Sequence, residues 1–109
     1  MARQTACLNV RITRIWDLDW YPGLAECILV DALGAEHRFQ DKIPVFSPRD
    51  LAPEDIPCAG MLRCTIAGEN PDGTLTVNTE FPDDIKSAAG EHLFRVRPNQ
   101  LTGGEAFYA

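Results

Sequence analysis

The chain has 109 residues and a formal net charge of −6 at pH 7. This length allows one folded domain with one core and leaves no room for separate cofactor and substrate domains. Leu, Ile, Val and Phe together make up about a quarter of the residues, which is more than a disordered chain carries. The acidic balance disfavours nucleic acid as a partner, because phosphate backbones are held by basic surfaces.

The N-terminal segment and the apolar runs predict a cytoplasmic protein. The first ten residues alternate between polar and apolar types and lack the apolar core of a secretory signal. The longest apolar run, Cys27–Val30, is far shorter than the roughly 18 residues that would indicate a membrane span. We therefore expect no contact with a membrane.

The four cysteines are expected to stay reduced in such a compartment. A zinc site needs closely spaced pairs such as C-x₂-C, and the tightest spacing here is Cys58-x₅-Cys64. The sequence also lacks the glycine motifs G-x-x-x-x-G-K and G-x-G-x-x-G that bind phosphates. We expect no metal and no cofactor, and we interpret the cysteines as small hydrophobic residues. They are Cys7, Cys27, Cys58 and Cys64.

The first predicted strand begins near the N-terminus. Leu8, Val10 and Ile12 alternate with polar residues, so one face of this strand should be buried. The alternation slips at Ile15 and Trp16, which predicts a bulge or the end of the strand before a turn.

The next two strands form the clearest hairpin of the sequence. Residues 24–32 are apolar on both faces, which is typical of a central strand, and residues 36–46 again alternate. Gly34 supplies the positive φ that a tight connection requires. Pro44 cannot donate a ladder hydrogen bond, so the second half of residues 36–46 should lie at an edge or leave the sheet.

The second half of the chain predicts one helical turn and a second hairpin. Ser47 followed by Pro48 is a helix-start signal. Strands over residues 61–67 and 75–79 flank an Asn-Pro-Asp-Gly turn. Further elements follow: a helical turn or an irregular loop over residues 82–90, a last strand around residues 94–96, and a mobile C-terminal tail over residues 101–109.

These elements predict the fold class. About six short, mostly antiparallel strands with one short helical turn form an all-β protein, a small barrel or a sandwich. Residues 1–109 would form this single β domain. A closed or half-closed barrel is favoured, because no helix is available to cover the apolar faces of a flat sheet.

One stretch resembles a group of known sequences. Glu26 to Val45 reads E-C-x-L-x-D-A-x-G-x-x-H-x-F-x-x-K-x-P-V. In this form it resembles small uncharacterised bacterial β-proteins, which have no established activity. The resemblance implies a bacterial cytoplasmic origin and transfers no catalytic or ligand-binding role.

An acid/base group is one candidate site. A hairpin that turns near Gly34 would place Asp31 beside His37, and a carboxylate there could orient the imidazole, with Asp41 further along the strand. These three residues would define a small-ligand or enzymatic site. In the alternative interpretation, Asp31 binds backbone amides of the turn and His37 packs its ring against the protein. No serine or cysteine nucleophile is associated with the group.

A loop rich in aromatic residues is the second candidate. Aromatic side chains bury a large area at a low entropic cost, so an acidic aromatic loop predicts a non-enzymatic contact with a protein partner, in particular a basic one. An acidic bacterial immunity or antitoxin-type protein is a special case. Alternatively, one indole covers an open end of the core. The loop residues are Trp16, Asp17, Asp19, Trp20 and Tyr21.

Two further classes are less favoured by the sequence. A stripe of outward-facing arginines would suit an OB-like binder of single-stranded nucleic acid. Any long uncovered edge strand would allow weak self-association. The stripe would consist of Arg11, Arg63, Arg95 and Arg97.

Overall fold

The structure is a computed structural model that describes residues 4–103 of the chain. Within this range, seven strands form one sheet, joined by one short α-helix and two 3₁₀ turns. The elements are β1 (Thr5–Trp16), β2 (Leu24–Val30), β3 (Glu36–Lys42), α1 (Ile43–Phe46), η1 (Pro53–Asp55), β4 (Cys58–Glu69), β5 (Leu75–Asn78), β6 (Leu93–Val96), η2 (Pro98–Gln100) and β7 (Leu101–Gly103).

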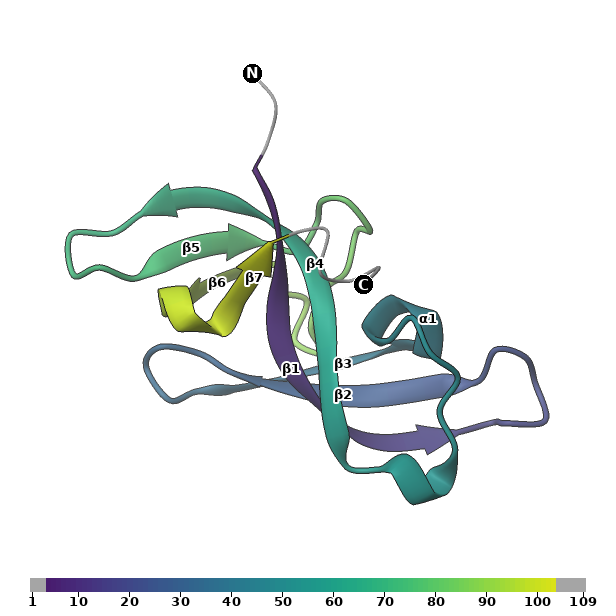
Figure 1. Ribbon diagram of the computed structural model, residues 1–109. Helices are drawn as coiled ribbons and strands as arrows, with labels where there is room; N and C mark the ends of the chain where they lie inside the picture. Colours follow the sequence, from purple (N-terminus) through teal and green to yellow (C-terminus); the bar gives the residue numbers. More distant parts are fainter. Residues whose placement is uncertain (1–3, 104–109) are drawn as a thin grey trace.

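The sheet is antiparallel and curls into a half-barrel around β1 (Figure 1). Its strand order is β3-β2-β1-β4-β5-β6, and β7 pairs with the first half of β1. The second half of β1, from Arg11 to Trp16, pairs with β2, and the register of this pairing shifts between Ile12 and Arg14. The prediction of a small, mostly antiparallel β fold with one short helical turn is confirmed.

Side chains and loop hydrogen bonds connect the two ends of this strand order. The Phe39 ring of β3 packs edge-on against Phe94 of β6, with 5.5 Å between the ring centroids. The backbone N–H of Ala32, in the β2–β3 turn, donates to the carbonyl of Arg95 at 2.9 Å. The N–H of Ala88 donates to the carbonyl of Arg38 in β3 at 2.8 Å. The open side of the half-barrel is therefore partly closed without a continuous ladder.

The core lies inside this curl and follows the alternation seen in the sequence. The apolar residues of β1 that we expected to face inward are buried, whereas Asn9 and Arg11 between them are exposed. The largest fully buried side chains come from all parts of the sheet and from α1. They include Phe39, Phe46, Leu8, Ile12, Leu29, Leu62, Val77 and Val96.

The predicted turns are present. Gly34 has a φ of +86° and Gly73 a φ of +89°, the left-handed conformation that these connections require. Residues 82–90 form the irregular loop, with Ile85 buried in the core. This loop replaces the helical turn that was the alternative.

The prediction of a helix start at Ser47-Pro48 is wrong. The helical turn is α1, one segment earlier, with Pro44 in its first turn. The turn forms there because it places Ile43 and Phe46 in the core. Strand β3 accordingly ends at Lys42, and the chain leaves the sheet before Pro44, as expected from the missing N–H.

Leu101–Gly103 also differ from the expectation of a mobile tail over residues 101–109. They pair with Ala6–Leu8 of β1 as strand β7. The rest of the expected tail, residues 104–109, lies outside the described residues.

Candidate functional site

Trp20 and Tyr21, in the β1–β2 loop, lie at the surface of the protein. Trp20 is 52% exposed and Tyr21 is 84% exposed, and Leu18 between them and the end of β1 is 44% exposed. The loop turns through a hydrogen bond from the Trp20 N–H to the carbonyl of Asp17. Trp20 and Tyr21 are therefore available for contact, and neither covers the core.

Trp16 lies differently from Trp20. It is the last residue of β1, pairs with Leu24 and is half-buried. The guanidinium of Arg14 lies 5.0 Å from the centre of its ring, in the geometry of a cation–π contact. Arg14 thus covers part of the Trp16 ring, and Trp20 is the more accessible of the two indoles.

A groove lies next to this loop. It has a volume of about 310 Å³, near the lower end of the range of about 300–1,000 Å³ typical of ligand pockets. One wall comes from the loop and the other from the segment before η1. The groove is lined by Leu18, Tyr21, Pro22, Ile43, Asp50, Leu51, Ala52 and Pro53.

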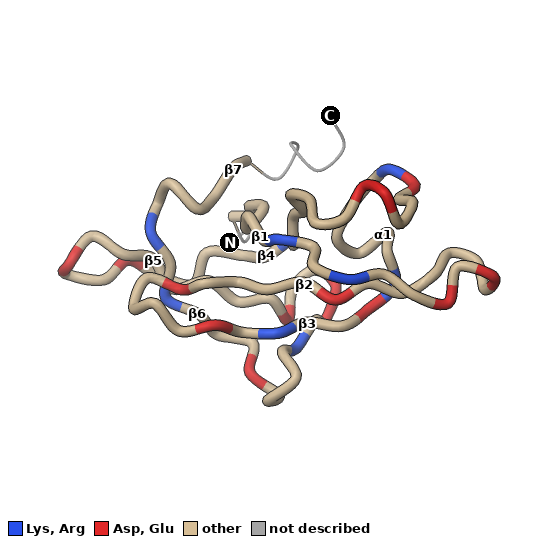
Figure 2. Tube along the Cα trace, turned by 90° about the horizontal axis from the view of Figure 1, so that it is seen from below, with Lys and Arg blue, Asp and Glu red and all other residues tan. Residues whose placement is uncertain are grey.

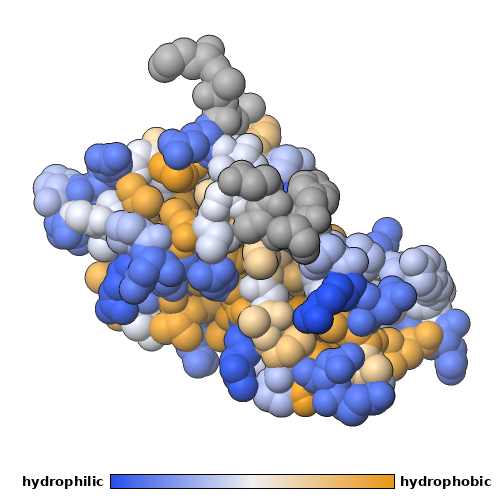
Figure 3. Space-filling view, in the orientation of Figure 1, coloured by the Kyte–Doolittle hydropathy of each residue, from blue (hydrophilic) through white to orange (hydrophobic). Residues whose placement is uncertain are grey.

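The two segments that line the groove are rich in carboxylates. Residues 17–22 and 50–55 contain five Asp and Glu residues and no Lys or Arg. Acidic positions accordingly appear at the end of the β1–β2 hairpin and beyond α1 (Figure 2). We call residues 17–22 and 50–55 together the acidic aromatic surface. At the end of the molecule that carries the hairpin, hydrophobic side chains reach the surface among hydrophilic ones (Figure 3).

The structure also brings Asp31 and His37 together. The Nε2 atom of His37 lies 2.8 Å from Oδ2 of Asp31. The other carboxylate oxygen of Asp31 accepts hydrogen bonds from the N–H groups of Leu33 and Ala35, at 2.9 and 3.0 Å. The His37 ring packs edge-on against Phe94 at 4.8 Å between centroids. Both features of the alternative interpretation, amide binding by Asp31 and ring packing by His37, are thus present.

The Asp31–His37 pair stabilises the β2–β3 turn, and its surroundings do not indicate a reaction site. The side chains of His37 and Asp31 are only 14% and 11% exposed, and neither residue lines one of the three main cavities of the described residues. Asp41 lies four residues further along β3, about 13 Å from His37 at the usual strand rise. Its carboxylate accepts a hydrogen bond from the N–H of Lys42, and Asp41 lines one of these three cavities. The structure therefore does not bring the three acid/base candidates together.

Partial burial of the Asp31 carboxyl raises its pKa, but hydrogen bonds with His37 and from the Ala35 and Leu33 amides outweigh this effect. The pKa of Asp31 is consequently held below its ordinary value. A carboxyl with a lowered pKa in the folded state stabilises the fold above its unfolded value of about 4, and this stability is lost as the pH falls through the folded-state value.

We therefore expect Asp31→Ala to lower the free energy of unfolding by about 2 kcal/mol at pH 7, because two turn amides and His37 lose their acceptor. Asp31→Asn should lower the free energy of unfolding by less, since the side-chain oxygen of asparagine can still accept a hydrogen bond from a backbone amide. Urea unfolding between pH 3 and pH 7 measures both. The stability difference between the wild type and Asp31→Asn should shrink below about pH 4; a difference that is constant over this range contradicts the role of the Asp31 charge.

The expected arginine stripe is interrupted. Arg63 forms a bidentate ion pair with Asp83, with Nε–Oδ2 and Nη2–Oδ1 distances of 2.9 and 2.6 Å. Arg97 donates to the carbonyl of Ala32 at 3.4 Å. The remaining two, Arg11 in β1 and Arg95 in β6, lie on strands that β4 and β5 separate. These four arginines do not form a continuous row of free cations.

Within residues 4–103 the four cysteines form no disulfide, and three of them are buried. Burial raises the pKa of the Cys64 thiol to about 12 and also raises that of Cys27, so both stay protonated and unreactive at neutral pH. In residues 4–103, no group of three or more His, Cys, Asp and Glu side chains is arranged to hold a metal ion. The same range has no helix long and apolar enough to span a membrane.

Comparisons with known proteins add no name to this site. No protein-family model, no curated protein and no solved structure matches the chain. The function of the acidic aromatic surface is therefore inferred from its own geometry. The sequence predicted the half of this surface that the β1–β2 loop forms. It did not predict the wall at Leu51–Pro53, because no local pattern indicates that this segment packs beside the loop.

Proposed function

We propose that this protein is a non-enzymatic binding module whose acidic aromatic surface holds a basic segment of a partner protein. The observation that carries the proposal is the groove between the β1–β2 loop and residues 50–53, which is lined by the exposed Tyr21 and by Asp50, with the exposed Trp20 next to Tyr21 in the loop. Apolar side chains of the partner would enter the groove, and its Lys or Arg residues would face the carboxylates.

Charge and exposure both favour this type of partner. Contiguous apolar surface rimmed by polar residues marks binding sites on soluble proteins. Exposed tryptophan and tyrosine side chains are frequent anchors of protein interfaces. The local excess of carboxylates accelerates association with a cationic segment and rejects an acidic one. An acidic immunity or antitoxin-type protein that neutralises a basic bacterial toxin is the special case that we favour among such partners.

A random peptide display library tests this proposal, because it samples binding segments of every composition. Peptides selected on the whole protein should combine apolar residues with Lys or Arg. The double variant Trp20→Ala/Tyr21→Ala should weaken their binding at least about tenfold, because both anchors are lost. Higher salt should weaken binding to the wild type through screening. Calorimetry or fluorescence anisotropy measures the dissociation constants.

Leu33→Ala is the matched control. Leu33 is 75% exposed but lies in the β2–β3 turn, away from the acidic aromatic surface. This variant should bind the selected peptides as the wild type does. Acidic or uncharged selected peptides, or equal binding by the wild type and the double variant, contradict the proposal.

A further inference from the structure

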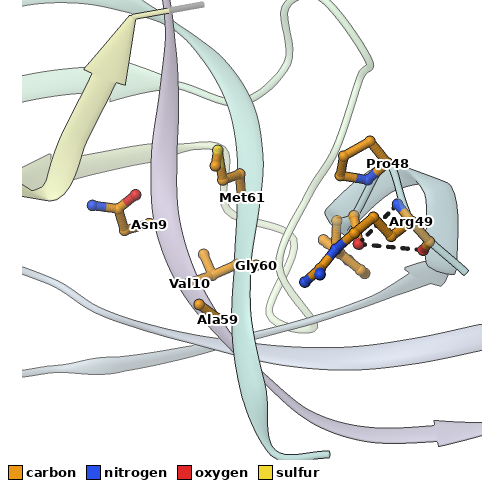
Figure 4. A pocket seen from close by; sticks show the side chains of 9 residues that line it. Asn9, Val10, Pro48, Arg49, Ala59, Gly60 and Met61 are labelled. Carbon is orange, nitrogen blue, oxygen red and sulfur yellow. Dashed lines mark hydrogen bonds between the residues drawn. The ribbon is translucent and has the colours of Figure 1, made fainter. Parts of the chain in front are cut away.

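A second cavity lies between β1, β4 and the segment after α1, just before the residues that form one wall of the groove. Its volume is about 290 Å³. Val10, Phe46, Gly60 and Met61 supply apolar lining, and Asn9 and Arg49 add polar groups. The cavity is shown in Figure 4. It is therefore an apolar pocket with a small number of polar groups, which is the usual composition of a small-molecule site.

The residues that line this cavity carry a positive charge, whereas the protein as a whole is negatively charged. Its nine lining residues include one arginine and no Asp or Glu, although the chain as a whole carries a net charge of −6. Each of the two other main cavities is lined by at least one carboxylate, Asp41 and Asp83 in one and Asp50 in the other. The local charge of the lining thus favours an anion.

Arg49 is held in position but its charge is not used within the described residues. The Arg49 N–H donates to the Ser47 hydroxyl at 3.2 Å, and that hydroxyl donates to the Arg49 carbonyl at 3.3 Å. This small turn fixes the backbone, and the side chain extends toward β4 (Figure 4). No carboxylate of residues 4–103 forms an ion pair with the guanidinium.

Asn9 supplies the second polar group at the opposite wall. It lies on β1 directly opposite Met61 of β4 and is exposed. Its side-chain amide forms no hydrogen bond with another described residue. Neither Arg49 nor Asn9 would therefore have to give up a side-chain contact with another described residue to bind a ligand.

We propose that this cavity binds a small organic carboxylate with an apolar body. The apolar part would lie against Pro48, Ala59 and Met61, and the carboxylate would accept charge-assisted hydrogen bonds from Arg49. A volume of about 290 Å³ limits the body to the size of one aromatic ring with a short chain. This site shares no lining residue with the groove of the acidic aromatic surface and does not depend on the proposed protein partner.

A matched pair of probes tests the proposal. The acid 4-phenylbutyrate and the alcohol 4-phenylbutan-1-ol share the same apolar body and differ in charge. In ¹H–¹⁵N NMR titrations, the acid should shift the amide signals of Arg49, Gly60 and Met61 with a dissociation constant of about 1 mM or lower. Arg49→Gln should weaken binding of the acid about fivefold to tenfold and leave the alcohol unchanged within about twofold.

Two controls make the result specific to this cavity. Arg95→Gln removes an exposed arginine on β6 and should leave binding of the acid unchanged, whereas Ala59→Phe should block both probes by filling the cavity. Trp20→Ala should have no effect. The proposal is overturned if the acid and the alcohol bind equally to the wild type, if Arg49→Gln binds the acid as the wild type does, or if the shifted signals lie elsewhere.

Discussion

Phe39→Ala should lower the free energy of unfolding by about 4 kcal/mol, the largest effect that we expect from one substitution. Phe39 is fully buried, and its ring contacts Phe94 across the two ends of the strand order. Its removal leaves a large cavity and also ends an aromatic pair worth about 1 kcal/mol beyond its buried area. A small domain is stable by only about 5–15 kcal/mol, so chemical denaturation will show a large shift of the midpoint.

Conservative substitutions separate the two contributions. Phe39→Leu keeps most of the apolar volume and should cost about 1.5 kcal/mol. A double-mutant cycle with Phe39→Leu and Phe94→Leu should give a coupling energy of about 1 kcal/mol if the edge-on contact stabilises the closure of the half-barrel. Additive effects of the two substitutions would show that Phe39 acts through burial alone.

The alternation of apolar residues was sufficient to predict the fold class. It indicated that Leu8, Val10 and Ile12 of β1 face the core, because every second side chain of a half-buried strand points inward. It did not predict β7, since Leu101–Gly103 are too few for a period and only one of them is apolar. This strand forms because its backbone pairs with the first half of β1, a contact between the two ends of the chain.

The helical turn shows a different limit of local sequence signals. A proline in the first helical turn is a start signal, and both Pro44 and Pro48 provide it. The choice between them depends on tertiary burial: helix formation over Ile43–Phe46 places two apolar side chains in the core. Capping preferences are worth about 1 kcal/mol, whereas burial of a large side chain is worth about 2–3 kcal/mol, so burial determines the position.

The candidate sites were predictable only where their residues are close in sequence. The aromatic loop was visible as a cluster of Trp, Tyr and Asp, and the Asp31–His37 contact followed from the hairpin that turns at Gly34. The groove beside Tyr21 and the cavity beside Arg49 combine segments from different parts of the chain. Such sites depend on how the half-barrel curls, which alternation along single strands does not specify.

Gly60→Ala should lower the free energy of unfolding by about 2–3 kcal/mol, although it adds only one methyl group. Gly60 is buried in β4 opposite Val10, where the sheet approaches α1. An added Cβ would lie 2.8 Å from two side-chain carbons of Ile12 and 3.1 Å from the carbonyl oxygen of Phe46. Ile12 is fully buried and cannot move away freely, and the Phe46 oxygen belongs to the backbone. Denaturant unfolding with an unchanged m-value will measure the loss.

Gly68→Ala is the matched control in the same strand. A Cβ at Gly68 would meet no atom within 4 Å, and its φ lies outside the left-handed region, so the added methyl group should be neutral or should stabilise the fold by up to about 1 kcal/mol. Ile12→Val should relieve part of the clash, so its cost should be smaller in the Gly60→Ala background than in the wild type. Equal effects of Gly60→Ala and Gly68→Ala would contradict close packing of β4 against Ile12 and α1. Because Gly60 also lines the cavity of Arg49, the same approach of β4 to α1 that excludes a side chain at this position shapes the wall on which the proposed carboxylate ligand would lie.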